Sequence, residues 1–247
     1  MVKDKIILID KPAGWTSFDV VAKIRGKIRA EYTAKGEKPT KRQLRVGHAG
    51  TLDPFATGLL IILISDACKK AGEFLKLDKT YEFTAKLGEV SSTGDPEGDI
   101  STYMRSDFST ENGKSYNTYA TLMGNQQLSV NDIKTVLQQF IGEISQTPPQ
   151  YSAIKINGKR AYKLAREGKQ VDIPTRKVQI NRLELVEYNY PYLKCVCDVS
   201  SGTYIRSLVE DIGKVFKTGA YCQELRRIRI GNYKIEDATT VALLTIR

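Results

Sequence analysis

Residues 47–64 read Gly47-His48-Ala49-Gly50-Thr51-Leu52-Asp53-Pro54-Phe55-Ala56-Thr57-Gly58-Leu59-Leu60-Ile61-Ile62-Leu63-Ile64. The last six residues form an unbroken apolar run of strand length, which predicts a strand buried inside the protein. The twelve residues before it include three glycines, which permit backbone conformations closed to other residues. We therefore expect a rigid loop held against a core strand.

This loop carries the chain's only histidine, His48, and a single carboxylate, Asp53. Pro54 disfavours the helical region for the residue before it, so Asp53 is held in extended backbone and its carboxylate points in a fixed direction. Catalytic groups are often found on loops that a rigid scaffold positions. The alternative is ordinary turn chemistry, which Asp-Pro in a glycine-rich segment also fits.

Basic residues outnumber acidic ones, 38 to 28, which gives a net charge of +10 and suits a polyanionic partner. The excess is concentrated between Lys23 and Arg45, where nine basic residues face two acidic ones. This segment lacks the bulky apolar face of a membrane-surface helix, so nucleic acid is the favoured partner. A solvated face that only keeps the protein in solution is the competing interpretation.

The remaining composition excludes several classes of protein. At 247 residues, the chain is long enough to bury a good core as one domain. No apolar run approaches the length of a membrane span, and the first residues do not resemble a secretory signal. The four cysteines lack metal-site spacing, so zinc is not expected, and Cys195 and Cys197 fit packing thiols in a reducing cytoplasm.

Strands and helices alternate along the chain without an internal repeat. The first helix is predicted to begin at a cap at Thr16 or Ser17 and to bury Phe18, Val21, Ile24 and Ile28; a polar loop should follow at 31–45. Further helices are predicted at 66–77, 129–141, 159–167 and 204–217. Strands are predicted at 6–9, 59–64, 81–87, 151–156, 177–187, 193–199 and 225–233. Several connections are too short for parallel crossovers, so we expect an α+β fold with a mixed, largely antiparallel sheet flanked by helices.

The string from Gly47 to Gly58 closely resembles the signature of the bacterial TruB family of tRNA pseudouridine synthases. The resemblance implies the pseudouridine synthase fold and makes Asp53 the catalytic nucleophile. It extends along nearly the whole chain through four further blocks in the family's order: Lys11-Pro12-Ala13-Gly14-Trp15-Thr16-Ser17, Asp78-Lys79-Thr80-Tyr81-Glu82-Phe83, Pro148-Pro149-Gln150-Tyr151-Ser152-Ala153-Ile154-Lys155 and Ser201-Gly202-Thr203-Tyr204-Ile205-Arg206.

The resemblance also assigns expected roles to single residues. Tyr81 would pack on the target base, and Arg206 would pair with the catalytic aspartate. Tyr204 and Leu225, the latter within Leu225-Arg226-Arg227, match positions of the uridine pocket. His48 matches a histidine that reshapes the RNA loop, and Lys69 aligns with a lysine near the site.

Each of these residues has a plain alternative role. Tyr81, Tyr204 and Leu225 sit in apolar patterns typical of core positions, Arg206 alone would be a surface charge, and a single histidine is usually structural. Asp95, Glu97 and Asp99 lack the remaining ligands of a calcium loop and are interpreted as an acidic turn. Only the joint occurrence of the motifs in family order favours the functional roles.

Two departures from the family bear on RNA affinity. Bacterial members usually continue into a small RNA-binding PUA domain, for which no room remains before Arg247, and the segment near 31–45 is longer than usual. We expect the basic segment from Lys23 to Arg45 to supply part of the RNA affinity. The residues expected to contact the RNA backbone are Lys38, Lys41, Arg42, Arg45, Arg227 and Arg229.

The resemblance implies a cytoplasmic, monomeric enzyme that isomerises a uridine in the T arm of tRNA, at position 55 of the TΨC loop. No metal or other cofactor is expected, because the reaction needs no redox or phosphoryl chemistry. No membrane and no obligatory protein partner are expected either. Two alternatives remain. One is a non-catalytic RNA-binding or tRNA-folding module on the same scaffold, and the other is a subunit directed by a guide RNA.

Overall fold

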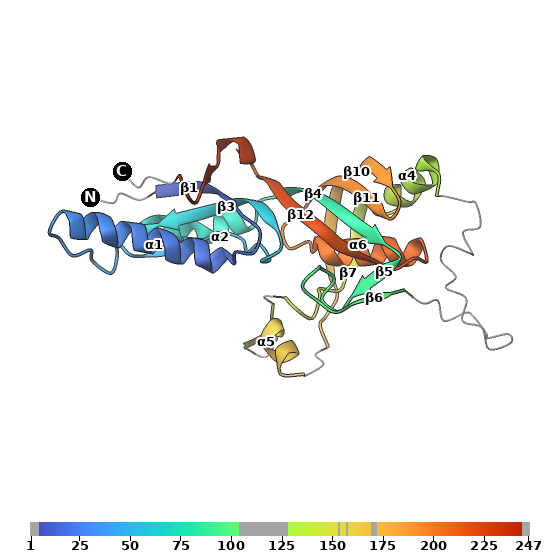
Figure 1. Cartoon of the computed structure of the whole chain (residues 1–247), viewed down its shortest axis with the longest axis horizontal. Helices are drawn as coiled ribbons and strands as arrows, with labels where there is room; N and C mark the ends of the chain where they lie inside the picture. The colour runs from blue at the N-terminus through green and yellow to red at the C-terminus, as the bar shows by residue number, and fades with distance from the viewer. Residues whose placement is uncertain (1–4, 104–127, 153, 157, 169–171, 244–247) are drawn as a thin grey trace. The chain divides into compact units, whose positions relative to one another are not determined.

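The computed structural model describes residues 5–103, 128–152, 154–156, 158–168 and 172–243 (Figure 1). The chain divides into two compact units. The first comprises Met1–Glu82, Asp198–Gly202 and Leu225–Arg247; the second comprises Phe83–Cys197 and Thr203–Glu224. The expectation of a single catalytic domain with a basic insertion and no PUA domain stays a prediction.

The first unit is built around β3 (Thr57–Ile64), the apolar run of the signature segment. β3 pairs antiparallel with β1 (Lys5–Lys11) over its whole length and with β2 (Val46–His48). The sheet of this unit has the order β14-β1-β3-β12, and its parallel pairs are β1–β14 and β3–β12. The remaining strands of this unit are β12 (Ala220–Ile230), β13 (Tyr233–Lys234), which pairs with β12, and β14 (Thr239–Thr240).

Both faces of β3 are covered, which explains why its sequence is apolar at every position. Leu60, Ile62 and Ile64 pack with the buried face of α1 (Ser17–Ala34), as Figure 1 shows for the helix along the sheet. The intervening residues pack on the other side with a 3-10 helix (Ser65–Lys70) and α2 (Ala71–Leu75). The predicted helix at 66–77 is therefore a 3-10 turn followed by a short α-helix.

The start of α1 follows the sequence prediction in its cap but not in its first apolar residue. Thr16 forms a capping box with Asp19, which ties the first backbone N–H groups of the helix to side chains. Phe18 was expected in the core but is 61% exposed, and Val20 is buried instead. The helix continues to Ala34, so the polar loop begins later than the predicted residue 31.

The second unit contains the sheet order β4-β11-β10-β7 with helices against it. Its strands are β4 (Lys79–Leu87), β7 (Gly142–Gln146), β10 (Arg176–Asn189) and β11 (Tyr192–Val199), of which β4 and β11 also contribute residues to the first unit. Its helices are α4 (Val130–Gln138), α5 (Ala161–Arg166) and α6 (Ile205–Val215). The predicted capping box of α4, Ser129 with Asp132, is present.

Two small hairpins complete the second unit: β5 (Glu89–Ser91) with β6 (Ile100–Thr102), and β8 (Lys155–Ile156) with β9 (Lys159–Arg160). Of the predicted strand at 151–156, residues 155–156 form β8, residues 151, 152 and 154 are not in a strand, and residue 153 lies outside the described residues. Cys195 and Cys197 are fully buried on one face of β11, as expected for packing thiols. The α+β prediction, with a mixed and largely antiparallel sheet, is confirmed.

Candidate active site

Asp53 lies in the irregular segment that joins β2 to β3, and it is half-buried. Its backbone carbonyl accepts a hydrogen bond from the N–H of Ala56 at 3.1 Å, which closes a tight turn around the aspartate. At the near end of the segment, the N–H of Ala49 donates to the carbonyl of Ile61 at 2.9 Å. The carboxylate is thus carried by a short loop tied to the central strand.

The residues on either side of Asp53 are fixed by residues 11–17, at the end of β1 and the start of α1. The hydroxyl of Ser17 donates to the carbonyl of Leu52 at 3.1 Å and accepts from the N–H of the same residue at 2.8 Å. The carbonyl of Pro54 accepts from the N–H of Gly14 at 2.9 Å and from Nζ of Lys11 at 3.2 Å. The opening motif therefore braces the loop, a role that its sequence alone did not reveal.

Lys11 is fully buried, and this placement makes its ammonium a fixed structural donor. Besides Pro54, the ammonium donates to the carbonyls of Pro12 at 2.9 Å and Trp15 at 2.6 Å. Three backbone carbonyls thus share one buried charge, and a buried charge is tolerated only when it is well bonded. The ammonium joins the turn after β1 to the residue next to Asp53.

A second brace comes from Leu225-Arg226-Arg227 on β12. Arg227 is 1% exposed, and its guanidinium donates to the carbonyls of Leu59 at 2.8 Å, Gly50 at 3.1 Å and Thr51 at 3.5 Å. Arg226 forms a two-pronged pair with Asp10 at 2.8 and 3.1 Å. The burial of Arg227 contradicts its expected contact with the RNA backbone, because the side chain bonds internally and faces no solvent.

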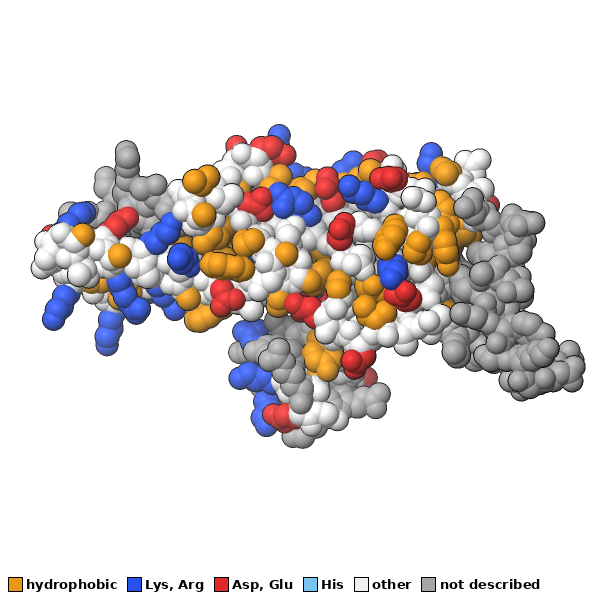
Figure 2. Space-filling model, in the orientation of Figure 1, with side chains coloured by type: hydrophobic (Ala, Val, Ile, Leu, Met, Phe, Trp, Pro, Cys, Tyr) orange, Lys and Arg blue, Asp and Glu red, His pale blue; other side chains and the backbone are white. Residues whose placement is uncertain are grey.

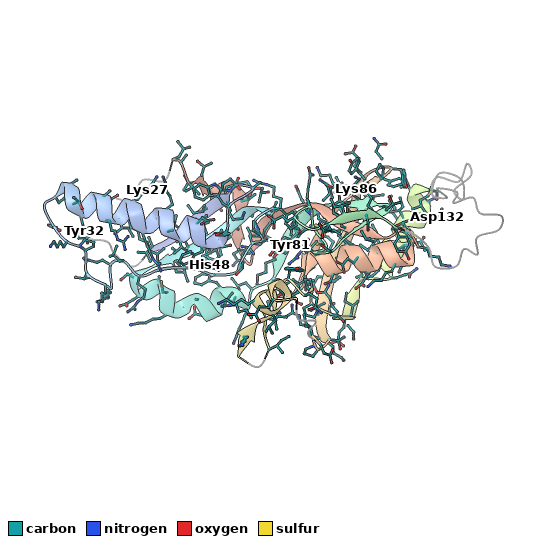
Figure 3. All side chains as sticks on the ribbon, turned by 60° about the horizontal axis from the view of Figure 1, so that its bottom comes forward. Lys27, Tyr32, His48, Tyr81, Lys86 and Asp132 are labelled. Atoms are coloured by element: carbon teal, nitrogen blue, oxygen red, sulfur yellow. The ribbon has the colours of Figure 1, made fainter. Side chains whose placement is uncertain are left out.

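Tyr81, Leu225 and His48 also belong to the first unit; Figure 3 labels Tyr81 and His48. Tyr81 on β4 and Leu225 on β12 are each 8% exposed, while His48 on β2 is half-buried and its Cα pairs with that of Ile62. Low exposure fits both a core position and the wall of a closed pocket. Their roles toward a base therefore stay predictions.

Lys69 lies in a cluster of positive charges around Asp66. Its ammonium is 3.4 Å from the Asp66 carboxylate, which also pairs with Arg42 and, at 3.4 Å, with Arg45. The three cationic side chains are 48–70% exposed. One carboxylate thus gathers three cations, and the cluster keeps a positive surplus. Lys38 and Lys41 are exposed nearby in the sequence.

Arg206 and Tyr204 lie in the second unit at the start of α6. Arg206 is buried, and its guanidinium pairs with Asp95 at 2.9 Å and donates to the carbonyls of Thr93 at 2.7 Å and Tyr151 at 2.8 Å. Asp95 also accepts from the N–H of Glu97 at 3.0 Å. The interpretation of this segment as an acidic turn is correct but incomplete, because it missed the buried partner of Arg206.

Tyr204 occupies the N-cap position of α6 without a side-chain capping bond. Its backbone is held by the side-chain amide of Gln146, whose oxygen accepts from the Tyr204 N–H at 2.8 Å and whose nitrogen donates to the Tyr204 carbonyl at 3.0 Å. The guanidinium of Arg176 lies 4.8 Å from the centre of the Tyr204 ring, within cation–π distance. The expected pairing of Arg206 with Asp53 joins residues of different units and stays a prediction.

Lys79 and Cys195 have large pKa shifts. Burial lowers the pKa of Lys79 to about 8, Arg227 lowers it further, and Asp78 opposes the shift. The Lys79 ammonium donates to the carbonyls of Leu75 at 2.7 Å and Leu77, at the end of α2. Burial raises the pKa of Cys195 to about 12, so this thiol stays protonated and unreactive.

Arg229 follows Arg227 on β12 but is less buried. Its guanidinium donates to the hydroxyl of Thr80 at 2.8 Å and pairs with Asp198 at 3.1 Å, and its side chain is 39% exposed.

Within the described ranges, no group of three or more His, Cys, Asp and Glu side chains is placed to hold a metal ion. No helix among the described residues is long and apolar enough to cross a membrane.

Two family models match the chain. One, described as TruB family pseudouridylate synthase (N terminal domain), matches residues 37–205, and one described as tRNA pseudouridylate synthase B C-terminal domain matches residues 206–246. The tRNA pseudouridine synthase B of Aquifex aeolicus is 40% identical over 240 residues, which cover 96% of this chain and 72% of that protein. The protein of the same name from Phocaeicola vulgatus is 39% identical over 237 residues, covering 96% and 90%.

A solved structure described as "Crystal Structure of a Cbf5-Nop10-Gar1 Complex" is similar in fold, with a TM-score of 0.65 and 26% sequence identity. The match covers 96% of this chain and 52% of that chain, so this chain spans about half the length of its structural neighbour.

Proposed function

The chain belongs to the TruB family of pseudouridylate synthases, and from this membership we propose that it converts a uridine in the T arm of tRNA, position 55 of the TΨC loop, to pseudouridine. The observation that carries the proposal is the bracing of Asp53. Backbone groups on both sides of this aspartate are fixed by Ser17, Lys11 and Gly14. A reacting group held in a defined geometry lowers the barrier of the step it takes part in.

In the proposed reaction, the bond between N1 of uracil and C1′ of ribose breaks, the base rotates, and a bond forms between C5 and C1′. N1 gains a proton and C5 loses one, so the product is an isomer of the substrate. An ionised Asp53 acts as the nucleophile, either on the uracil ring or on C1′. The target base must first leave the stack, at a cost of a few kcal/mol.

The other pocket residues would act on the flipped base and on the nucleophile. Tyr81 would stack on the uracil, and Tyr204 and Leu225 would wall the pocket against water. Arg206 would keep Asp53 ionised, because a neighbouring positive charge favours the charged carboxylate. Its burial and its three fixed partners support a positioned charge rather than a mobile surface arginine. His48 would help to reshape the RNA loop.

The RNA backbone would be held by the basic residues after α1. Figure 2 shows Lys and Arg side chains gathered around α1 and the turn that follows it. Lys38, Lys41, Arg42 and Arg45 are all exposed, and the cations gathered by Asp66 add Lys69 to this surface. Arg229 is half-exposed and remains a candidate contact. We further propose that the protein acts as a monomer in the cytoplasm without an obligatory protein partner.

The test is the mapping of pseudouridine in tRNA transcripts incubated with the purified protein alone. The proposal expects conversion of the T-loop uridine at position 55 and of no other. Tight tRNA binding without conversion would favour the non-catalytic RNA-binding or tRNA-folding module. Conversion that requires an added guide RNA and accessory proteins would favour the guide-directed subunit. A control transcript with cytidine at position 55 should remain unmodified.

A further inference from the structure

We propose that Arg227 is a positioning residue for the reaction: its guanidinium fixes the backbone of the loop that presents Asp53. The inference rests on the proposed function, because it assigns a role in the same site. Arg227 is distant from Asp53 in the sequence and was expected on the RNA-facing surface. Its contacts assign it instead to the interior side of the loop.

The guanidinium bridges the two arms of the loop. Its Nε donates to the carbonyl of Leu59, six residues after Asp53, at 2.8 Å. Its Nη2 donates to Gly50 at 3.1 Å and its Nη1 to Thr51 at 3.5 Å, three and two residues before Asp53. One planar group thus sets the separation of the two arms between which Asp53 lies. A lysine ammonium, a single point charge, cannot reproduce this fork.

Two glycines of the signature segment lie against Arg227, one beside its backbone and one beside its guanidinium. β12 pairs with β3 at Arg227 and Gly58, where a Cβ on the glycine would lie 2.3 Å from the Arg227 carbonyl oxygen. Gly50 has a φ of +103°, and a Cβ on it would lie 3.6 Å from Nη1. Gly58 therefore permits the close backbone contact between β12 and β3 at Arg227, and the positive φ of Gly50 favours a glycine beside the guanidinium.

Burying the Arg227 guanidinium carries an electrostatic cost, so packing alone does not explain why an arginine occupies this position. In the part of the chain that the structure describes, the Arg227 nitrogens bond only to backbone carbonyls and form no ion pair, and Lys79 is a second buried cation whose pKa Arg227 lowers. An apolar side chain would fill the site without this electrostatic cost. What an apolar side chain cannot do is bond the carbonyls of both arms.

The experiment compares Arg227→Met and Arg227→Lys with the unmodified protein in single-turnover conversion of a T-arm stem–loop at saturating enzyme. RNA affinity and the folded fraction are measured on the same samples. We expect the saturated rate to fall at least about 100-fold for Arg227→Met, which corresponds to about 2.7 kcal/mol in the barrier, and about tenfold for Arg227→Lys. Affinity should change less than about threefold, because Arg227 does not reach the RNA.

Lys79→Met is the matched control, because Lys79 is also a buried cation of the first unit that donates to backbone carbonyls, but not to those of the loop. It should keep its saturated rate within about twofold, because its carbonyl partners lie outside the loop that presents Asp53. Guanidinium ion at tens of millimolar should restore part of the rate of Arg227→Ala, and sodium chloride at the same concentration should not.

Three results would overturn the inference. The first is a folded Arg227→Met protein that converts RNA at the rate of the unmodified protein, and the second is a loss of RNA affinity without a loss of rate. The third is that neither Arg227→Met nor Arg227→Lys yields folded protein, which would show that Arg227 is needed for folding alone. Failure of the proposed function is recognised separately, because the unmodified protein itself would then convert no uridine.

Discussion

The guanidinium of Arg206 lies 2.9 Å from the carboxylate of Asp95, and the two side chains are only 3% and 5% exposed. The same guanidinium donates to the carbonyls of Thr93 and Tyr151, so its plane is fixed by three partners. A buried pair of this kind contributes little net stability while intact, but the removal of one partner leaves a buried charge without its counter-charge.

Asp95→Asn should therefore lower the free energy of unfolding by about 3–5 kcal/mol. It should also slow single-turnover conversion, because Arg206 loses the group that orients it. Urea unfolding and the saturated rate are the measurements. Asp99→Asn is the control: it lies on the same turn but is exposed, and it should change stability by less than about 0.5 kcal/mol. Equal effects of the two substitutions would contradict this account.

Asp53→Asn keeps the shape of the side chain and removes its ability to act as a nucleophile. Conversion should fall to the detection limit, because the amide cannot replace an ionised carboxylate. Affinity for tRNA should change by less than about tenfold, or roughly 1.4 kcal/mol. Pseudouridine mapping and filter binding measure the two quantities. Robust pseudouridine formation by this variant would remove Asp53 from the mechanism.

Tyr81→Leu should slow single-turnover conversion far more than it weakens tRNA binding, because the flipped base loses the ring on which it stacks. Tyr32→Leu is a matched control, since Tyr32 belongs to the same unit and is also 8% exposed but packs in the α1 core (Figure 3). It should lose stability and keep its saturated rate. If both variants lose rate equally, or if Tyr81→Leu loses affinity alone, the platform role is wrong.

Reversal of the four exposed cations Lys38, Lys41, Arg42 and Arg45 to glutamate should weaken tRNA binding strongly at low salt and little at high salt. Each lost phosphate contact should reduce the slope of log affinity against log salt by about 0.7 to 0.9. The saturated rate should survive. A control of equal charge change reverses exposed lysines of the second unit: Lys134, Lys177, Lys194 and Lys217. An unchanged slope in the first variant would identify the basic segment as a solubilising surface.

Lys79 should make stability depend on alkaline pH. Its pKa is about 8 in the folded protein and has the ordinary value of 10.5 when unfolded, so between these values the unfolded chain binds more protons. The free energy of unfolding should therefore rise with pH in this window relative to Lys79→Met, by about 1–2 kcal/mol between about pH 7 and about pH 9.5. Below about pH 7, where Lys79 is protonated in both states, the difference should be constant. Urea unfolding of both proteins at the two pH values checks this, and a falling difference would contradict it.

The sequence predicted best where one local rule decides the structure. The apolar run of β3 and the capping boxes at Thr16 and Ser129 formed as expected, because burial on two faces and two reciprocal hydrogen bonds leave few alternatives. The short β7 was not predicted, because Gly142–Gln146 carries a weak pattern and owes its conformation to pairing with β10.

Arg227 and Arg229 show why charged side chains were harder. The alternating pattern predicted that both arginines lie on one face of the strand. In the structure, Arg227 is buried while Arg229 is half-exposed. What buries Arg227 is a loop almost 170 residues earlier, whose carbonyls appear in no side-chain pattern. Arg206, taken alone, would likewise have been interpreted as a surface charge, but its side chain is buried and pairs with Asp95. The periodicity of apolar residues in the sequence cannot predict a hydrogen bond between a side chain and the backbone of a distant segment.

The loop around Asp53 is closed like a ring, and this limits how the protein can be altered. Strand pairing fixes one side of the ring at His48 and Ile62, and Arg227 fixes the other between Gly50 and Leu59. One inserted residue would lengthen the ring by about 3.3 Å and turn the following side chains to the wrong face of the sheet. A change in the number of residues in this segment would therefore move the aspartate that it holds, even where every side chain that contacts Asp53 is kept.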